Sequence, residues 1–184
     1  MSPDVRRLFI ALWPDQAVRD AFADLQKRLP PGIGRPVSID NLHLTLVFLG
    51  STAAERQHCI EQALQGIDSP SFSIQLDQLG YWRKPQVLWA GSTPASPPLL
   101  ALVQALQTVC VRCGCEVDTR PYQTHLTLYR KVRKAPRDLP VMTPVIWPVN
   151  GFSLVESVTA ATGAEYRVLR TWHLSGNGVA STSQ

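Results

Sequence analysis

Apolar and polar positions alternate in extended runs and then follow helical stripes, in an order that occurs twice along this chain. In the first half, Arg6–Trp13 reads as a strand, and Pro14-Asp15 then opens an amphipathic helix over Gln16–Leu29. The apolar stripe of that helix consists of Val18, Phe22, Leu25 and Leu29. A Pro/Gly loop over Pro30–Pro36 leads to an extended run containing His43, followed by a helix over about Ala53–Leu64 and a strand over Phe72–Leu79.

The second half repeats this order. Its predicted elements are a strand over Gln86–Gly91, a Pro/Ser turn over Thr93–Pro98, a helix over Leu99–Cys113 with Leu102, Val103, Leu106 and Val109 inward, and strands over Glu116–Thr119 and Tyr122–Tyr129. Two further strands are expected over about Val149–Ser157 and Tyr166–Leu174, with a turn at Thr162-Gly163.

Strand, helix and His-containing strand therefore appear twice, which indicates an internal duplication. The spacing agrees, since Phe9 precedes His43 by 34 residues and Trp89 precedes His125 by 36. We predict an α+β fold in which two pseudo-twofold-related lobes, each an antiparallel sheet with outer helices, surround a central cleft. Residues 1–184 would form this single bilobal domain, with Ser175–Gln184 as a flexible tail.

Composition narrows the class of protein without naming it. The chain is 45% hydrophobic and 17% charged, as in ordinary globular domains. No apolar run approaches the roughly 18 residues of a membrane span, and the first apolar stretch, interrupted at Trp13-Pro14, is too short for a signal peptide. We expect a cytoplasmic protein with no membrane association and no obligate protein partner, monomeric because the duplication already supplies the symmetry.

The formal net charge of +4 is a mild excess that favours anionic partners. Much of it directly follows the second His-containing run, in Arg130, Lys131, Arg133, Lys134 and Arg137. This segment is either a solvated basic loop or a rim that attracts phosphate.

Four cysteines occur, at Cys59, Cys110, Cys113 and Cys115. The last three crowd one region, but without a second pair they make a poor tetrahedral metal set. We therefore prefer reduced, partly buried thiols over a zinc site.

Two nearly identical tetrads carry the candidate chemistry, His43-Leu44-Thr45-Leu46 and His125-Leu126-Thr127-Leu128, with their histidines 82 residues apart. In a strand, residues i and i+2 point to the same face. Each tetrad thus presents an imidazole and a hydroxyl to one side and two leucines to the core. If the duplication brings the tetrads together, two imidazoles and two hydroxyls share a cleft.

Such a cleft suits acid–base cleavage of a phosphodiester. One imidazole must begin neutral and the other protonated, which predicts a bell-shaped pH profile. The hydroxyls of Thr45 and Thr127 would donate to the non-bridging oxygens, and Arg130 would clamp a phosphate edge. Phe9 and Trp89, at matching places in the two halves, either stack against a base or sugar or belong to the core.

Simpler interpretations exist for each of these residues. Threonine is common in strands, and a single His-x-Thr arises often by chance. His58 and His173 have no partner in the pattern and are expected to be structural. A binding module that uses the cleft without turnover is a second hypothesis for the whole protein, and a metal-dependent hydrolase is a weak third, because no Asp/His cluster has ligand spacing.

The chain resembles the two-histidine phosphoesterase superfamily, and specifically the bacterial RNA 2′,3′-cyclic phosphodiesterases, also described as 2′-5′ RNA ligases. The segments that carry the likeness are Arg7–Leu12, His43–Gly50, Tyr122–Arg130 and Phe152–Ser157, followed by Tyr166 and Trp172.

This resemblance implies metal-independent hydrolysis of RNA ends or nucleoside 2′,3′-cyclic phosphates to 2′-phosphomonoesters, without a cofactor. It casts His43 as the proton donor and His125 as the proton acceptor, with Thr45, Thr127 and Arg130 holding the phosphate. The spacing itself does not decide that polarity, because the halves are nearly symmetric. The reverse reaction, 2′-5′ ligation, is allowed by microscopic reversibility.

Overall fold

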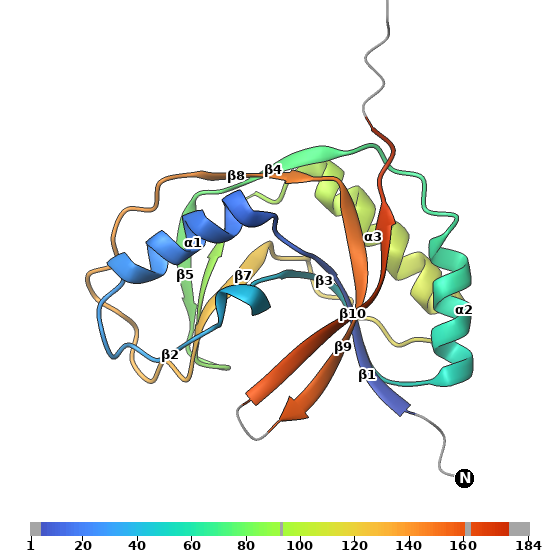
Figure 1. Cartoon of the computed structure of the whole chain (residues 1–184), viewed down its shortest axis with the longest axis horizontal. Coiled ribbons are helices and arrows are strands. Elements are labelled where there is room, and N and C mark those ends of the chain that lie inside the picture. Colours follow the sequence, from blue (N-terminus) through green and yellow to red (C-terminus); the bar gives the residue numbers. More distant parts are fainter. Residues whose placement is uncertain (1–4, 93, 161–162, 177–184) are drawn as a thin grey trace, which may run out of the picture.

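A computed structural model describes residues 5–92, 94–160 and 163–176 (Figure 1). Its helices are α1 (Gln16–Arg28), α2 (Ala54–Leu64) and α3 (Pro97–Arg112), with a short 3₁₀ turn η1 (Ile39–Asn41). Its strands are β1 (Val5–Leu12), β2 (Arg35–Pro36), β3 (Leu44–Ala53), β4 (Phe72–Leu76), β5 (Gln78–Trp82), β6 (Val87–Gly91), β7 (His125–Arg130), β8 (Val145–Val149), β9 (Gly151–Ala160) and β10 (Gly163–His173).

One large antiparallel sheet organises the molecule. Its strand order is β10-β9-β1-β3-β7-β6-β5, with β2 added to β7, and a separate ribbon pairs β4 with β8. The two strands predicted to carry the tetrads, β3 and β7, are neighbours at its centre. The strands β1 and β3 on one side are matched by β6 and β7 on the other, each pair joined through a helix. The α+β class with antiparallel sheets is confirmed.

The helices pack on the face of the sheet that carries the tetrad leucines. Leu44 and Leu126 are both 0% exposed and share one hydrophobic cluster with buried residues of all three helices, such as Phe22, Ile60 and Leu106. In Figure 1, α1 and α2 lie at opposite sides of the view with β3 and β7 between them. The opposite face of the sheet is therefore left open for the histidines.

Local signals explain why the helices begin where they do. Asp15 caps α1, its carboxylate accepting a hydrogen bond from the backbone N–H of Val18 at 2.9 Å. Ser96 caps α3 in the same way, and a proline occupies the first turn. The predicted helices agree with the structure to within two residues at each end, and the apolar stripe of α1 is buried as expected.

Two strand predictions need correction, and strand β8 was not predicted. The run Phe72–Leu79 divides after Leu76, so that β4 pairs with β8 while β5 joins the large sheet. Glu116–Thr119 is not a strand, and Asp118 there instead accepts hydrogen bonds from Arg120 in a local turn. The strand β8 was missed because Pro148 interrupts its pattern, which an edge strand of a two-stranded ribbon tolerates.

The remaining predictions of this kind fall at the C-terminal end. Strands β9 and β10 correspond to the two predicted there. Thr93, Thr162 and most of the predicted tail, residues 177–184, lie outside the described residues.

The expectation of four reduced thiols is wrong for two of them. Cys59 in α2 and Cys113 at the end of α3 form a disulfide with a Cα–Cα distance of 5.8 Å. Cys110 and Cys115 remain free and buried, and burial raises the pKa of the Cys110 thiol to about 12. With two sulfurs already joined, the four cysteines cannot serve as a zinc site.

No helix among the described residues is both long and apolar enough to span a lipid bilayer.

Candidate active site

The register between β3 and β7 brings the two tetrads together. Leu44 pairs with Leu126 in an antiparallel arrangement. Extending this antiparallel register by one residue in each direction sets His43 opposite Thr127 and Thr45 opposite His125. Because side chains alternate across a strand, all four project from the face opposite the buried leucines. The histidines then form a diagonal pair, and such diagonal neighbours lie about 7 to 8 Å apart, with their Cβ atoms somewhat closer.

Each imidazole is held by the same local hydrogen bond. The Nδ1 atom of His43 lies 2.7 Å from the carbonyl oxygen of Asn41, and that of His125 lies 2.9 Å from the carbonyl oxygen of Gln123. A carbonyl oxygen can only accept, so Nδ1 carries the hydrogen in both rings. Each Nε2 is thereby left to exchange a proton with a substrate.

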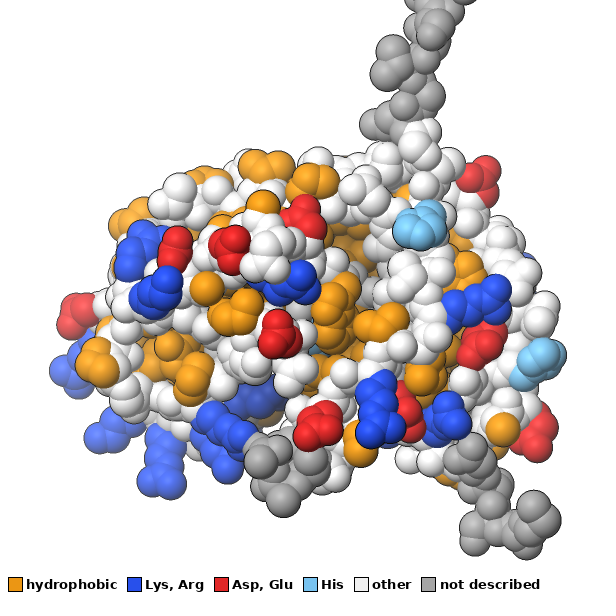
Figure 2. All heavy atoms as spheres, viewed as in Figure 1, with side chains coloured by type: hydrophobic (Ala, Val, Ile, Leu, Met, Phe, Trp, Pro, Cys, Tyr) orange, Lys and Arg blue, Asp and Glu red, His pale blue; other side chains and the backbone are white. Residues whose placement is uncertain are grey.

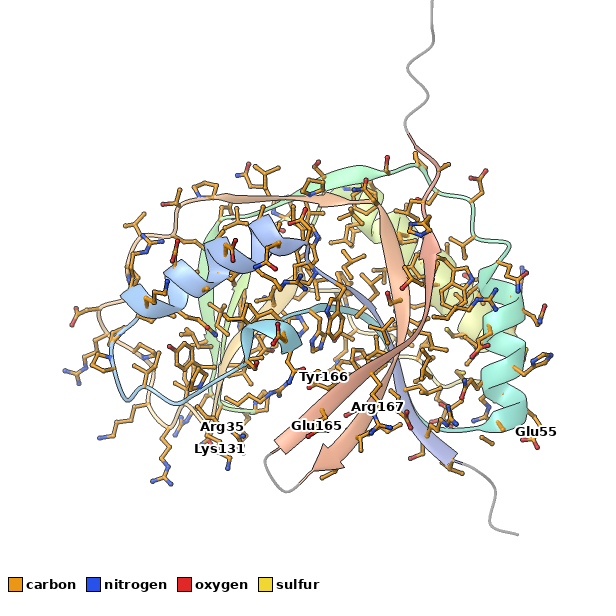
Figure 3. All side chains as sticks on the ribbon, in the orientation of Figure 1. Arg35, Glu55, Lys131, Glu165, Tyr166 and Arg167 are labelled. Carbon is orange, nitrogen blue, oxygen red and sulfur yellow. A yellow bond between two sulfur atoms is a disulfide. The ribbon has the colours of Figure 1, made fainter. Side chains whose placement is uncertain are left out.

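His43 lies among aromatic rings contributed by β1, by the residue that follows it and by β10. Trp13 stacks on it at 5.4 Å with an interplanar angle of 8°, and Tyr166 meets it edge-on at 4.8 Å. Phe9 lies 5.0 Å from it. Figure 3 labels Tyr166 on β10, together with its sequence neighbours Glu165 and Arg167.

This enclosure governs the protonation of His43. Burial lowers its pKa to about 4, against the Asn41 carbonyl, which favours the charged ring. Electrostatic repulsion of the charged ring by Arg130, and by His125 when it is protonated, contributes to this lowered value. In the ligand-free protein His43 is therefore neutral at pH 7.

His125 has a more open environment. Its ring meets Trp82 edge-on at 4.7 Å. Burial lowers its pKa as well, opposed by the Gln123 carbonyl, and Arg130 again lowers it. The two imidazoles make the same hydrogen bond but have different aromatic neighbours.

Arg130, at the end of β7, is exposed, and its charge acts on both histidines. It pairs across the strand with Arg35 of β2. Of the two threonines, Thr45 is 7% exposed and Thr127 is half-buried. The backbone of Thr45 is tied to the segment before β7, because the Tyr122 hydroxyl donates to its carbonyl oxygen at 2.8 Å.

Phe9 contacts His43, and Trp89 pairs with Thr127 between β6 and β7, but both side chains offer little free surface. Phe9 is 4% and Trp89 6% exposed, and Trp89 packs against Trp82 at 5.2 Å. Gly80 and Gly91 leave room for the indole, since a Cβ atom at either would come within 3 Å of its ring carbons. Both side chains are therefore packed against their neighbours, which favours the interpretation that they belong to the core.

Sequence reasoning did not assign Trp13, Trp82 or Tyr166 to the site, although all three contact a histidine. Strand parity points to the first of them. Phe9, Ala11 and Trp13 alternate onto one face, which is the face that carries His43. Trp82 and Tyr166 reach their histidines only through strand pairing, which no local pattern reveals.

Comparison with known proteins finds similarity to phosphoesterases. The model of the LigT-like phosphoesterase family matches residues 12–89. The RNA 2′,3′-cyclic phosphodiesterase of Escherichia coli is 33% identical over 171 residues, covering 92% of this chain and 97% of that protein. The protein of the same name from Thermus thermophilus is 33% identical over 183 residues, covering 92% and 91%.

Among solved structures, the fold matches E. coli LigT complexed with 3′-AMP. The TM-score is 0.86 at 33% identity, over 93% of this chain and 99% of that one.

Proposed function

As the chain belongs to the LigT-like phosphoesterase family, we propose that it hydrolyses RNA 2′,3′-cyclic phosphate ends to 2′-phosphomonoesters by acid–base catalysis between His43 and His125. Nucleoside 2′,3′-cyclic phosphates carry the same reactive group and are substrates on the same argument. The observation that carries the proposal is the Leu44–Leu126 pairing, because it puts both imidazoles and both threonines on one face.

The reaction needs two proton transfers and no redox step. The neutral imidazole of His125 takes a proton from water through Nε2 as the water oxygen bonds to phosphorus. The bond from phosphorus to O3′ breaks, and His43 donates a proton to O3′. Water is consumed, and the products are a 2′-phosphomonoester and a free 3′-hydroxyl.

Charge that develops on the non-bridging oxygens is met by donors already in place. The hydroxyls of Thr45 and Thr127 lie on the face of the histidines, and Arg130 adds a positive charge near both. Fixed donors of this kind need no reorganisation during the reaction.

The donor role of His43 requires that the substrate change its protonation. Its pKa of about 4 leaves it neutral before binding. A phosphate anion between the imidazoles stabilises the charged ring and raises that pKa. We propose that His43 takes up its proton as the substrate binds.

A direct test uses purified protein and 2′,3′-cyclic AMP. Wild-type protein should release 2′-AMP and no 3′-AMP, and EDTA should leave the rate unchanged. His43→Ala should lose about 10² to 10⁴ in kcat, the usual contribution of general acid–base catalysis. His58→Ala is the matched control, because His58 is exposed in α2. Binding of 2′-AMP without turnover of any cyclic phosphate would instead favour the non-catalytic binding module.

A further inference from the structure

Exposed basic side chains gather at one end of the large sheet, beside the candidate active site. We call this set the basic rim, and its members are Arg83 and Lys84 in the β5–β6 turn and Lys131, Arg133 and Lys134 after β7. Figure 2 shows blue side chains clustered at the lower left, where Figure 3 labels Arg35 and Lys131.

Val132 holds the two segments of the basic rim together. Its side chain is 0% exposed, its N–H donates to the carbonyl oxygen of Gln86 at 3.0 Å, and its own carbonyl accepts from the Tyr81 hydroxyl at 2.8 Å. The charged neighbours on either side of it therefore project from an anchored backbone.

The basic rim accounts for the positive excess of the whole chain. Together with Arg35 and Arg130 it contains seven of the 18 lysines and arginines, which leaves eleven against 14 acidic residues elsewhere. The rest of the molecule is thus slightly acidic, and long-range attraction of a polyanion is directed to this end of the sheet.

The two halves of the chain differ in charge at matching positions. The five residues that begin five positions after His125 are Arg130-Lys131-Val132-Arg133-Lys134. The corresponding five after His43 are Phe48-Leu49-Gly50-Ser51-Thr52, which carry no charge, and Phe48 is 61% exposed. At these matched positions, the charge for a phosphate backbone lies in the segment after His125 and is missing from the segment after His43.

We propose that the basic rim binds the phosphates of an RNA strand on the 5′ side of its cyclic end, an inference that rests on the proposed function. A 2′,3′-cyclic phosphate is a 3′ terminus, so the strand can leave the site only in the 5′ direction. Arg130 joins the basic rim to the histidines, because its charge acts on both imidazoles. The strand therefore leaves over β5, β6 and β7, and its last base passes Trp82 next to Arg83.

The test compares 2′,3′-cyclic AMP with a hexanucleotide that ends in a 2′,3′-cyclic phosphate. The variant is Lys131→Asn, Arg133→Gln and Lys134→Gln together, with Asn at 131 because that residue has a φ of 57°. The matched control removes as many charges from helices α1, α2 and α3, as Arg28→Gln, Arg56→Gln and Arg112→Gln.

Wild-type protein should have a lower KM for the hexanucleotide than for cyclic AMP. The rim variant should raise the hexanucleotide KM by about tenfold at low salt and leave both constants for cyclic AMP within about twofold. The slope of log KM against log salt should fall by about 2, since each single-strand phosphate contact contributes about 0.7. The helix control should resemble wild type.

Equal KM values for the two substrates in wild type, or an unchanged salt slope in the rim variant, would overturn the proposal. A basic rim that serves an acidic protein or a lipid surface would give that second result. If wild type hydrolyses neither substrate, the proposed function fails, which is a separate outcome from loss of the hexanucleotide preference alone.

Discussion

His43 and His125 make the same hydrogen bond to a carbonyl two residues earlier, yet their rings lie in different surroundings. Three aromatic rings contact His43, whereas Trp82 is the one described ring that contacts His125. Burial disfavours the imidazolium form, so the more enclosed ring has its pKa lowered to about 4. The chemical symmetry of the tetrads is thus broken by their neighbours.

The first prediction concerns this enclosure. Both limbs of the kcat/KM profile should lie below the ordinary histidine value of 6.5, because burial lowers both pKa values. Trp13→Ala lets water reach His43, which favours the charged ring and raises its pKa. His43 is the more enclosed of the two rings, and the group with the lower pKa sets the acid limb of the profile. That limb should therefore move to higher pH. NMR titration of the histidines checks this, with His125 in the same variant as the control, and an unmoved His43 titration would contradict it.

A second prediction concerns Tyr122. Tyr122→Phe leaves the Thr45 carbonyl without its donor and should lower the free energy of unfolding by about 1 to 3 kcal/mol. The activity should fall too, because this bond ties β3 to the segment before His125. Tyr129→Phe is the control, since its hydroxyl donates to the Gln26 carbonyl away from the histidines. Denaturant unfolding measures the loss of stability, and kcat measures the loss of activity. An equal loss of activity in both variants would contradict the prediction.

At the scale of elements, sequence pattern predicted what depends on neighbours in the chain. The stripe of α1 and the alternation around His43 are local signals, and both elements formed as predicted. Pairing is not local. Pro148 obscured β8, whose partner β4 lies far away in the sequence. The contact between α2 and α3, which brings Cys59 to Cys113, has no local sequence pattern that would predict it.

The third prediction tests that helix contact. The disulfide spans 54 residues, so Cys59→Ser with Cys113→Ser should lower the free energy of unfolding by about 2 to 4 kcal/mol. The kcat should be unchanged, because the helices pack on the leucine face of the sheet. Denaturant unfolding measures the first quantity. A large loss of kcat in a variant that remains folded would contradict this assignment of faces.

At the scale of the whole molecule, the candidate site exists because a duplicated strand–helix–strand unit meets itself at β3 and β7. The repeated tetrads made that meeting predictable, and the pair Leu44–Leu126 fulfils it. The aromatic neighbours were not predictable in the same way. Tyr166 reaches His43 from β10 and Trp82 reaches His125 from β5, both through pairings set by the complete sheet.

The central claim is that both imidazoles act on one phosphate in one step, and a double-mutant cycle tests it most directly. The kcat for 2′,3′-cyclic AMP would be measured for wild type, His43→Ala, His125→Ala and the double variant. Groups that act as a unit are strongly non-additive, so the double variant should be about as slow as the slower single variant. A double variant slowed by the product of the two single effects, or a single variant that keeps the wild-type rate, would contradict the claim.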